Sequence, residues 1–265
     1  MEKAILDFGM IAPGDRVAVA VSGGKDSLAL MRLMRGPLVH VTQDFSLEFI
    51  HIDTGFPGHD PLPIRDYAVS CGVDLHVVKT DIYEQSAGKK KKVCWLCSRR
   101  RRKALLETAH SLGCGKVALG HHRDDAVETL LMNEFFNAEI SCMMPNQPLF
   151  RGEFHLIRPL YYVREANIVK LARELGLPAP AARCPAEDVS KREYIRRLLD
   201  TLEQERPVVR DHIFNAQFRV LDEYLPKLPE GGGPPPIPPR VFKKRKFAAR
   251  AEEGELSPGE KDREA

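Results

Sequence analysis

A run of small, hydroxyl and charged residues at 22–27 has the composition of an anion-binding loop. It reads Ser-Gly-Gly-Lys-Asp-Ser, follows a hydrophobic strand pattern over 16–21 and precedes a helical pattern over 27–34. Glycines let backbone N–H groups approach an anion, a helix N-terminus is partly positive, and the lysine adds a full charge. A Walker A loop is excluded, because it would need Gly in place of Val19 and Ser or Thr in place of Asp26. We therefore expect a different phosphate loop, formed by Ser22, Gly23, Gly24, Lys25, Asp26 and Ser27.

A second polar stretch, Gly-His-His-Arg-Asp-Asp at 120–125, also follows a strand pattern and opens a helix. Its two aspartates could simply stabilise the first helical turn through the helix dipole. We favour a functional interpretation, in which one carboxylate holds Mg²⁺ on nucleotide phosphates while a histidine or Arg123 contacts the nucleotide. The predicted catalytic residues are then Lys25, Asp26, Asp124 and Asp125, and the further predicted ATP contacts are Gly120, His121 and His122.

Asp53 is one more candidate for a nucleoside contact, because it ends a buried strand pattern over 47–52. Open α/β sheets bind ligands at the carboxyl ends of their strands. A purely structural role for Asp53, capping the turn that follows the strand, is an equally good interpretation.

The cysteines supply a different chemistry. Cys94 and Cys97 form a C-x-x-C pair, from which zinc, iron–sulfur and redox sites can all be built. Cys184, in a proline-rich loop, is the most plausible distant third thiolate, and three thiolates on a four-iron cluster would leave one iron open to bind sulfur. The alternative is a structural half-site or two buried thiols, although the flanking basic residues favour thiolates in an exposed loop.

Basic residues surround the cysteine pair, although the net charge of the whole chain is only +3. Four consecutive arginines span more than one helical turn, so they cannot all share one solvated face, and their mutual repulsion calls for an anionic partner. RNA phosphates fit best, and a solvated helix face is the alternative. The predicted RNA-binding residues are Lys89, Lys90, Lys91, Lys92, Arg99, Arg100, Arg101 and Arg102.

Strand and helix patterns alternate along most of the chain, which predicts an α/β fold with a parallel, Rossmann-like sheet. Residues 149–159 read as a hairpin or loop, and helical patterns follow at 164–175, 190–202 and 208–225. After residue 226 the chain is rich in proline, glycine and charge. We expect a nucleotide-binding domain over 1–160, a small helical region carrying Cys184 over 161–225, and a disordered tail over 226–265.

The composition, with 43% hydrophobic and 29% charged residues, is typical of a globular protein. There is no run of about eighteen apolar residues and no signal-peptide pattern at the N-terminus. We therefore expect no membrane association and a cytoplasmic location.

The loop at 22–27 resembles the signature of the PP-loop ATP pyrophosphatase superfamily, whose members share an adenine nucleotide alpha hydrolase-like fold. Several motifs follow one another in an order similar to that of the tRNA 2-thiocytidine synthetase branch. They are the loop at 22–27, the cysteine pair, the stretch at 120–125, Ile-Arg-Pro-Leu at 157–160 and Arg164-Glu165. This resemblance covers roughly residues 10–225. It implies an enzyme that uses ATP, Mg²⁺ and a 4Fe–4S cluster to thiolate a cytidine in the tRNA anticodon loop. A sulfur donor such as a cysteine desulfurase is implied as a partner, and a homodimer is compatible with it.

The chain departs from that branch at its second cysteine pair, because only Cys184 remains and Ala181 stands where its partner would be. Two other functions stay open. One is an adenylating tRNA ligase that attaches an amine, as lysidine synthetase does, and this chemistry would need no cysteines. The other is a non-catalytic RNA-binding protein that senses ATP or redox state.

Overall fold

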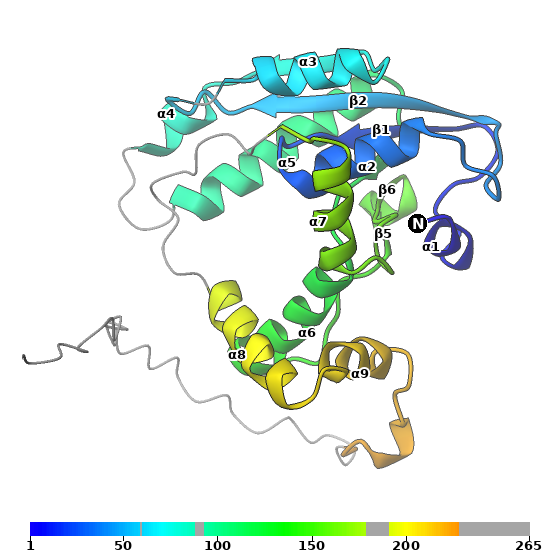
Figure 1. Cartoon of the computed structure of the whole chain (residues 1–265), viewed down its shortest axis with the longest axis vertical. Coiled ribbons are helices and arrows are strands. Elements are labelled where there is room, and N and C mark those ends of the chain that lie inside the picture. The colour runs from blue at the N-terminus through cyan, green and yellow to red at the C-terminus, as the bar shows by residue number, and fades with distance from the viewer. Residues whose placement is uncertain (59, 88–92, 179–190, 228–265) are drawn as a thin grey trace, which may run out of the picture. The chain divides into compact units, whose positions relative to one another are not determined.

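The computed structural model describes residues 1–58, 60–87, 93–178 and 191–227, with only the backbone described for 86–87 and 93–95. The chain divides into a compact unit, Met1–Asp222, and a second unit, Glu223–Ala265, of which only 223–227 are described. The whole sheet lies in the first unit (Figure 1).

A six-stranded sheet forms the centre of the fold (Figure 1). Across the sheet the order is β3 (Leu75–Lys79), β2 (Phe45–Asp53), β1 (Asp15–Ala20), β4 (Lys116–Ala118), β6 (Phe154–Ile157) and β5 (Asn146–Leu149). The first five strands are parallel, and β5 pairs antiparallel with β6. The predicted α/β class and parallel sheet are confirmed, and the ambiguous stretch after residue 145 is a hairpin at the sheet edge.

The helices are α1 (Glu2–Asp7), α2 (Lys25–Arg35), α3 (Leu62–Ser70), α4 (Ile82–Ala87), α5 (Val93–Ser111), α6 (Arg123–Asn137), α7 (Glu165–Glu174), α8 (Lys191–Glu205) and α9 (Val209–Ala216), and a 3₁₀ turn lies at Asp222–Tyr224. Helices cover both faces of the sheet, whereas α8 and α9 pack against α6 and each other. Side chains alternate across a strand, so Val17 and Val19 of β1 join the core beneath α2, α3 and α7. Ala18 instead joins a second core beneath α4 and α5.

Three helices differ from the sequence prediction. Helix α5 begins at Val93, so the cysteine pair lies within its first turns and not in a loop before it. The short helix α4 was not predicted, and α9 ends at Ala216 although the apolar pattern continues to residue 225. Val220 and Leu221 remain 56% and 59% exposed, so these two apolar residues of the last stretch lie largely in solvent.

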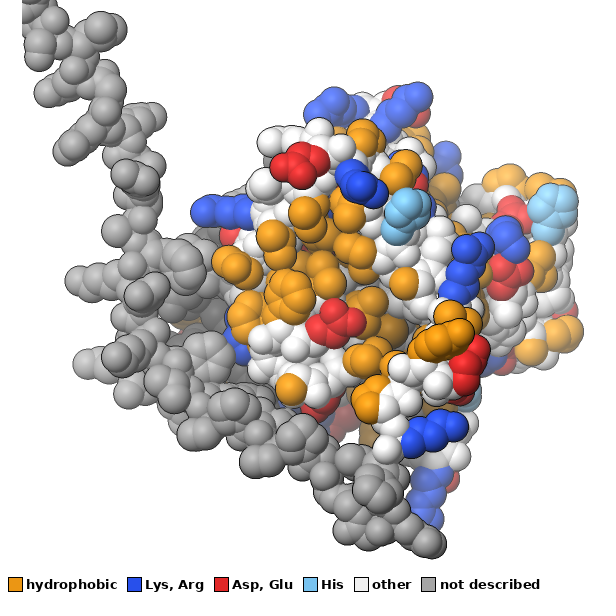
Figure 2. Space-filling view, turned by 90° about the horizontal axis from the view of Figure 1, so that it is seen from below, with side chains coloured by type: hydrophobic (Ala, Val, Ile, Leu, Met, Phe, Trp, Pro, Cys, Tyr) orange, Lys and Arg blue, Asp and Glu red, His pale blue; other side chains and the backbone are white. Residues whose placement is uncertain are grey.

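Exposed apolar side chains occur at this end of the molecule, among them Val208, Phe218, Val220 and Leu221. Figure 2, seen from below, shows apolar side chains gathered over the middle of that face, with lysines and arginines toward its edges. Among the helices of the described residues, none is long and apolar enough to cross a membrane.

Candidate functional site: a nucleotide pocket beside the first strand

The predicted phosphate loop joins the end of β1 to the start of α2, as the sequence indicates. Ser27 Oγ accepts a hydrogen bond from the Ser22 amide at 3.0 Å and donates one to the Gly24 carbonyl at 2.9 Å, which closes the loop on itself. Gly23 has a φ of +87°, a left-handed conformation in which a side chain would be strained. The hydrogen bonds and the left-handed glycine therefore fix the backbone of the loop as a turn at the N-terminus of α2.

The stretch at 120–125 meets this loop because β4 lies next to β1 in the sheet. A Cβ on Gly120 would lie 2.9 Å from the backbone nitrogen of Ser27, so only glycine permits this close approach. Chain order reverses between β1 and β4, and such a switch point is the usual ligand site of an open α/β sheet.

A cavity of about 240 Å³ opens at this junction. One side is apolar, formed by Ile50 and Ile52 of β2, Leu105 of α5 and Leu119. The other side is polar, and its residues are Ser22, Gly24, Asp26, Ser27, Gly120, His121 and Asp125, with Arg101 of α5 also in the lining. An apolar wall for a base beside a backbone cradle for phosphates is the arrangement that a nucleotide needs.

Lys25 is clamped between two carboxylates. Its Nζ lies 2.7 Å from Glu165 Oε1, at the start of α7, and 3.1 Å from Asp26 Oδ1. Burial alone would lower the pKa of Lys25, but the two carboxylates outweigh it and raise the pKa above its ordinary value. The ammonium is therefore charged at neutral pH and positioned at the phosphate loop.

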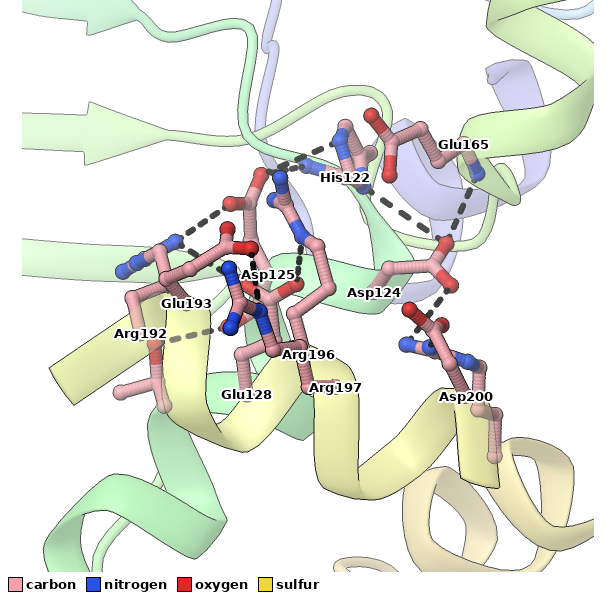
Figure 3. Close-up of polar contacts among 12 residues, drawn as sticks. His122, Asp124, Asp125, Glu128, Glu165, Arg192, Glu193, Arg196, Arg197 and Asp200 are labelled. Carbon is pink, nitrogen blue, oxygen red and sulfur yellow. Dashed lines mark hydrogen bonds and ion pairs between the residues drawn. The ribbon is translucent and has the colours of Figure 1, made fainter. Parts of the chain in front are cut away.

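His122 forms the N-cap of α6 and is 3% exposed. Its ring nitrogens lie 3.7 Å from Asp124 and 3.5 Å from Asp125 (Figure 3). They also lie 3.8 Å from Asp26. Asp125 Oδ2 accepts a hydrogen bond from the His122 amide at 3.0 Å, and Asp124 Oδ2 accepts one from the Glu165 amide at 2.7 Å. The aspartates thus act as helix caps and also bring His122, α7 and the phosphate loop together.

Helix α8 closes the other side of this cluster (Figure 3). Arg192 Nη1 lies 2.6 Å from Asp125 Oδ1 and 3.4 Å from Glu128, and Arg196 Nε lies 3.0 Å from Glu128. Glu128 is fully buried, and burial raises its pKa even though both arginines oppose the shift. Burial would also raise the pKa of Asp125, but His122, its amide and Arg192 hold that pKa below the ordinary value.

His121 faces the cavity as a neutral ring. Burial lowers its pKa to about 4, and its Nδ1 is buried without a hydrogen-bond partner among the described residues. A neutral imidazole with a spare nitrogen can bind a nucleotide group without adding charge. This is consistent with the predicted nucleotide contact.

Asp53 makes the contact that its alternative, structural role requires. Its Oδ1 accepts a hydrogen bond from the Gly55 amide at 3.0 Å, which caps the turn after β2. It is Ile50 and Ile52 of the same strand that line the cavity.

Comparison with known proteins agrees with this geometry. Residues 2–202 match the family model described as a PP-loop domain. The chain belongs to the PP-loop domain family.

Two curated relatives have the name tRNA-cytidine(32) 2-sulfurtransferase. The protein of Pelobacter propionicus is 41% identical over 228 residues, which cover 84% of this chain and 85% of the relative. The protein of Geobacter sulfurreducens is 39% identical over 228 residues, which cover 84% of this chain and 89% of the relative. The predicted tRNA 2-thiocytidine synthetase branch is confirmed at this level.

Among solved structures, the U34-tRNA thiolase NcsA from Methanococcus maripaludis, solved with its 4Fe–4S cluster, has the same fold. It superposes with a TM-score of 0.66 at 22% identity, covering 86% of this chain and 80% of NcsA.

The four arginines of this PP-loop domain are spread around α5, as expected for consecutive helical positions. Arg101 lines the nucleotide cavity, Arg100 is half-buried with its Nη1 atom lacking a hydrogen-bond partner among the described residues, and Arg99 and Arg102 are exposed. Burial lowers the pKa of Arg158 to about 10 and the charge of Arg102 adds to this, so Arg102 lies near that second guanidinium. Residues 89–92 lie outside the described residues.

Of the three predicted cluster ligands, the structure describes the side chain of Cys97 alone. Cys97 is half-buried and packs against the core beneath α5, which differs from the exposed loop that the flanking charges suggested. Cys94 lies one turn earlier in α5, with its side chain outside the described part, and Cys184 lies outside it altogether.

The fit of the expected cofactors can be tested on the described residues. The cavity has the apolar wall and the glycine-dependent cradle that ATP needs. No three of the described His, Cys, Asp and Glu residues are arranged to hold a metal ion. Mg²⁺ commonly binds through one or two carboxylates together with phosphate oxygens. Asp26 fits that use, because its carboxylate belongs to the phosphate loop and lines the cavity.

Several contacts of the site were not predicted from the sequence. Glu165 was noticed in a family match, but nothing in the sequence linked it to Lys25, 140 residues earlier. Arg192, Arg196 and Glu128 had no motif, and their pairing depends on how α6 and α8 pack.

Proposed function

We propose that this chain is an ATP-dependent tRNA thiolase that adenylates a cytidine of the anticodon loop and replaces its 2-oxygen with sulfur. The names of the two 2-sulfurtransferase relatives support the reaction and the substrate. The observation that carries the proposal is the position of α5. This helix carries Cys97, and one turn later its Arg101 lines the cavity that also contains the phosphate loop. Sulfur chemistry and adenylation would therefore meet at one site.

In the first half-reaction the cytosine O2 attacks the α-phosphorus of ATP, and the bond to pyrophosphate breaks. Negative charge grows on the departing pyrophosphate. The loop amides, the N-terminus of α2 and Lys25 are placed to stabilise that charge. Asp26 would hold Mg²⁺, while Asp124 and Asp125 would position His122 and α7 around the phosphates.

In the second half-reaction a sulfur at the sulfide (2−) level attacks C2 of the adenylated base, and AMP leaves with the former base oxygen. A 4Fe–4S cluster with one iron free of protein ligands would supply a binding place for that sulfur. Cys94, Cys97 and Cys184 are the proposed ligands. Arg101 faces the nucleotide pocket, so we assign it to the adenylated intermediate and keep Lys89–Lys92, Arg99, Arg100 and Arg102 as the proposed RNA contacts.

Other parts of this proposal concern partners and location. A cysteine desulfurase is the proposed sulfur donor, together with a two-electron reductant that brings its persulfide sulfur to the sulfide level. A homodimer and a cytoplasmic location are further predictions. The exposed apolar side chains at the α9 end of the molecule are the observation that favours self-association. Light scattering of the purified protein tests the oligomeric state.

The test of the proposed function is iron, sulfide and thiolation measured on protein purified without oxygen. We expect about four irons per chain, tRNA-dependent release of pyrophosphate and 2-thiocytidine in the product RNA. Cys184→Ala should lose iron and thiolation. Cys142→Ala, which changes an exposed cysteine, is the matched control and should keep both. Activity that survives in a colourless, iron-free protein would favour the amine ligase, and ATP binding without tRNA-dependent turnover would favour the sensor.

A further inference from the structure

A second cavity, which we call the four-helix cavity, lies between α6, α7, α8 and α9 and has a volume of about 520 Å³. Eleven of its fourteen lining residues are charged, six basic and five acidic. It shares no lining residue with the nucleotide cavity. The two are nevertheless neighbours, because Asp124 lines the four-helix cavity and Asp125 lines the nucleotide cavity.

The acidic residues of the four-helix cavity are already engaged. Arg210 takes up three of them, at 2.6 Å from Asp200, 2.7 Å from Glu203 and 3.7 Å from Asp124. The fourth, Glu165, holds Lys25 at 2.7 Å. None of these carboxylates is left to neutralise the remaining basic residues of the lining.

The basic residues, in contrast, are in excess along α7. Arg123 and Arg164 share a single carboxylate, that of Asp211. Among the described residues, the Lys170 ammonium pairs with Glu174 alone, at 3.9 Å, and this exposed contact contributes little in water. The side chain of Arg173 is exposed and has no hydrogen bond or ion pair within the described part of the chain. The edge of this cavity is therefore an anion-attracting surface.

The dimensions favour a chain of phosphates over a single anion. Arg164 is the N-cap of α7 and Arg173 lies in its last turn, so they are about 14 Å apart along the helix axis at 1.5 Å per residue. Guanidinium groups suit phosphate oxygens, which they can bind with two hydrogen bonds. Between the charges, Ala166 and Val169 give a small apolar surface against which a ribose or base could lie.

We propose that the four-helix cavity binds backbone phosphates of the RNA substrate through Arg164, Lys170 and Arg173. The inference rests on the proposed function, since it takes tRNA as the substrate. It adds an RNA-binding site on α7, separate from the basic helix α5. Asp124 and Glu165 line this cavity, Asp124 accepts a hydrogen bond from the Glu165 amide, and the Glu165 carboxylate pairs with Lys25. RNA held here would therefore lie beside the phosphate loop.

The experiment is a binding titration of full-length protein with tRNA over a series of salt concentrations. The variant is the double charge reversal Lys170→Glu/Arg173→Glu, at two exposed positions whose loss should not unfold the chain. We expect RNA affinity to fall at least about tenfold and the slope of log K against log salt to shrink by about two. ATP affinity and the melting temperature should stay unchanged.

The matched control is Arg65→Glu, a charge reversal on exposed α3, which should leave RNA affinity unchanged. Equal RNA binding by the double variant and the wild type would overturn the inference while the thiolation assay still supports the proposed function. Wild-type protein that binds no tRNA would overturn both. Binding of inorganic phosphate that is lost in the double variant, with RNA binding intact, would identify a free-phosphate site and also overturn the inference.

Discussion

The nucleotide cavity and the four-helix cavity lie side by side but are built in different ways. The first is formed by backbone turns at strand ends, with glycines at positions where any side chain would collide. The second is formed by side chains from four helices, and most of its lining is charged. A backbone cradle needs particular residues at fixed spacing, so it leaves a motif. Ion pairs between helices need only complementary charge at packed positions, so they leave none.

The difference also predicts how each cavity responds to mutation. A backbone cradle binds its ligand through amides that a side-chain substitution does not remove. The lysine of the loop is therefore the main side chain whose mutation should weaken ligand binding there. A cavity lined by paired charges depends on partners, and removing one member leaves the other uncompensated. Mutations at the two places should therefore have separable effects on ATP, on RNA and on stability.

The largest difference between the effects on adenylation and on RNA affinity is expected for Lys25→Ala. Adenylation should fall on the order of 10²–10³-fold, because the charge that grows on pyrophosphate loses its one full positive partner in the loop. RNA affinity should be unchanged, the reverse of the Lys170/Arg173 variant. Single-turnover release of pyrophosphate and tRNA titration measure the two quantities. Lys3→Ala, on exposed α1, is the control and should alter neither, and a Lys25→Ala enzyme with near-normal pyrophosphate release would refute the assignment.

The next effect is on folding stability and concerns the buried contact between α6 and α8. Arg192→Ala leaves Asp125 without its guanidinium and leaves fully buried Glu128 with Arg196 alone. We expect the free energy of unfolding to drop by about 2 kcal/mol, less than for a buried charge left with no partner at all. Denaturant unfolding measures it.

Arg197→Ala is the matched control for that measurement. It changes an arginine of the same helix, whose pair with Glu193 is exposed, and should cost less than about 0.5 kcal/mol. Equal losses in the two variants would mean that the buried pairing contributes nothing beyond a surface contact.

The sequence was informative where local geometry decides structure. The strand–loop–helix at 22–27 and the glycine at 120 were found because only glycine tolerates those backbone conformations and contacts. The antiparallel hairpin was ambiguous, since its two strands have only four residues each. The helix expected over 208–225 ends at Ala216, and apolar residues after it stay exposed. An apolar pattern alone does not show whether a neighbouring element is there to pack against that face.

Function-bearing contacts between distant segments could not be read in the same way. Arg101 is predicted with its neighbours as an RNA contact, and the structure adds that it lines the nucleotide cavity. The sequence does not show which of four consecutive arginines turns toward that cavity. Cys97 was expected in a charged, exposed loop, but helix α5 begins at Val93 and packs the half-buried cysteine against the core. Both outcomes depend on the rotation of one helix against the sheet.

Glu165 links the two cavities, and its substitution is the finest test of their separation. The Glu165 carboxylate lies 2.7 Å from Lys25 Nζ, and Glu165 also lines the four-helix cavity. Burial alone would raise the pKa of Glu165, but Lys25 holds that pKa below its ordinary value. Phosphates that bind Lys25 must compete with this carboxylate. Glu165→Gln keeps the shape and removes the charge, so pyrophosphate affinity, measured by calorimetry, should tighten by up to about tenfold, which is about 1.4 kcal/mol. Weaker binding would instead mean that Glu165 is needed to aim Lys25 at the loop, and the two cavities would then act as one site.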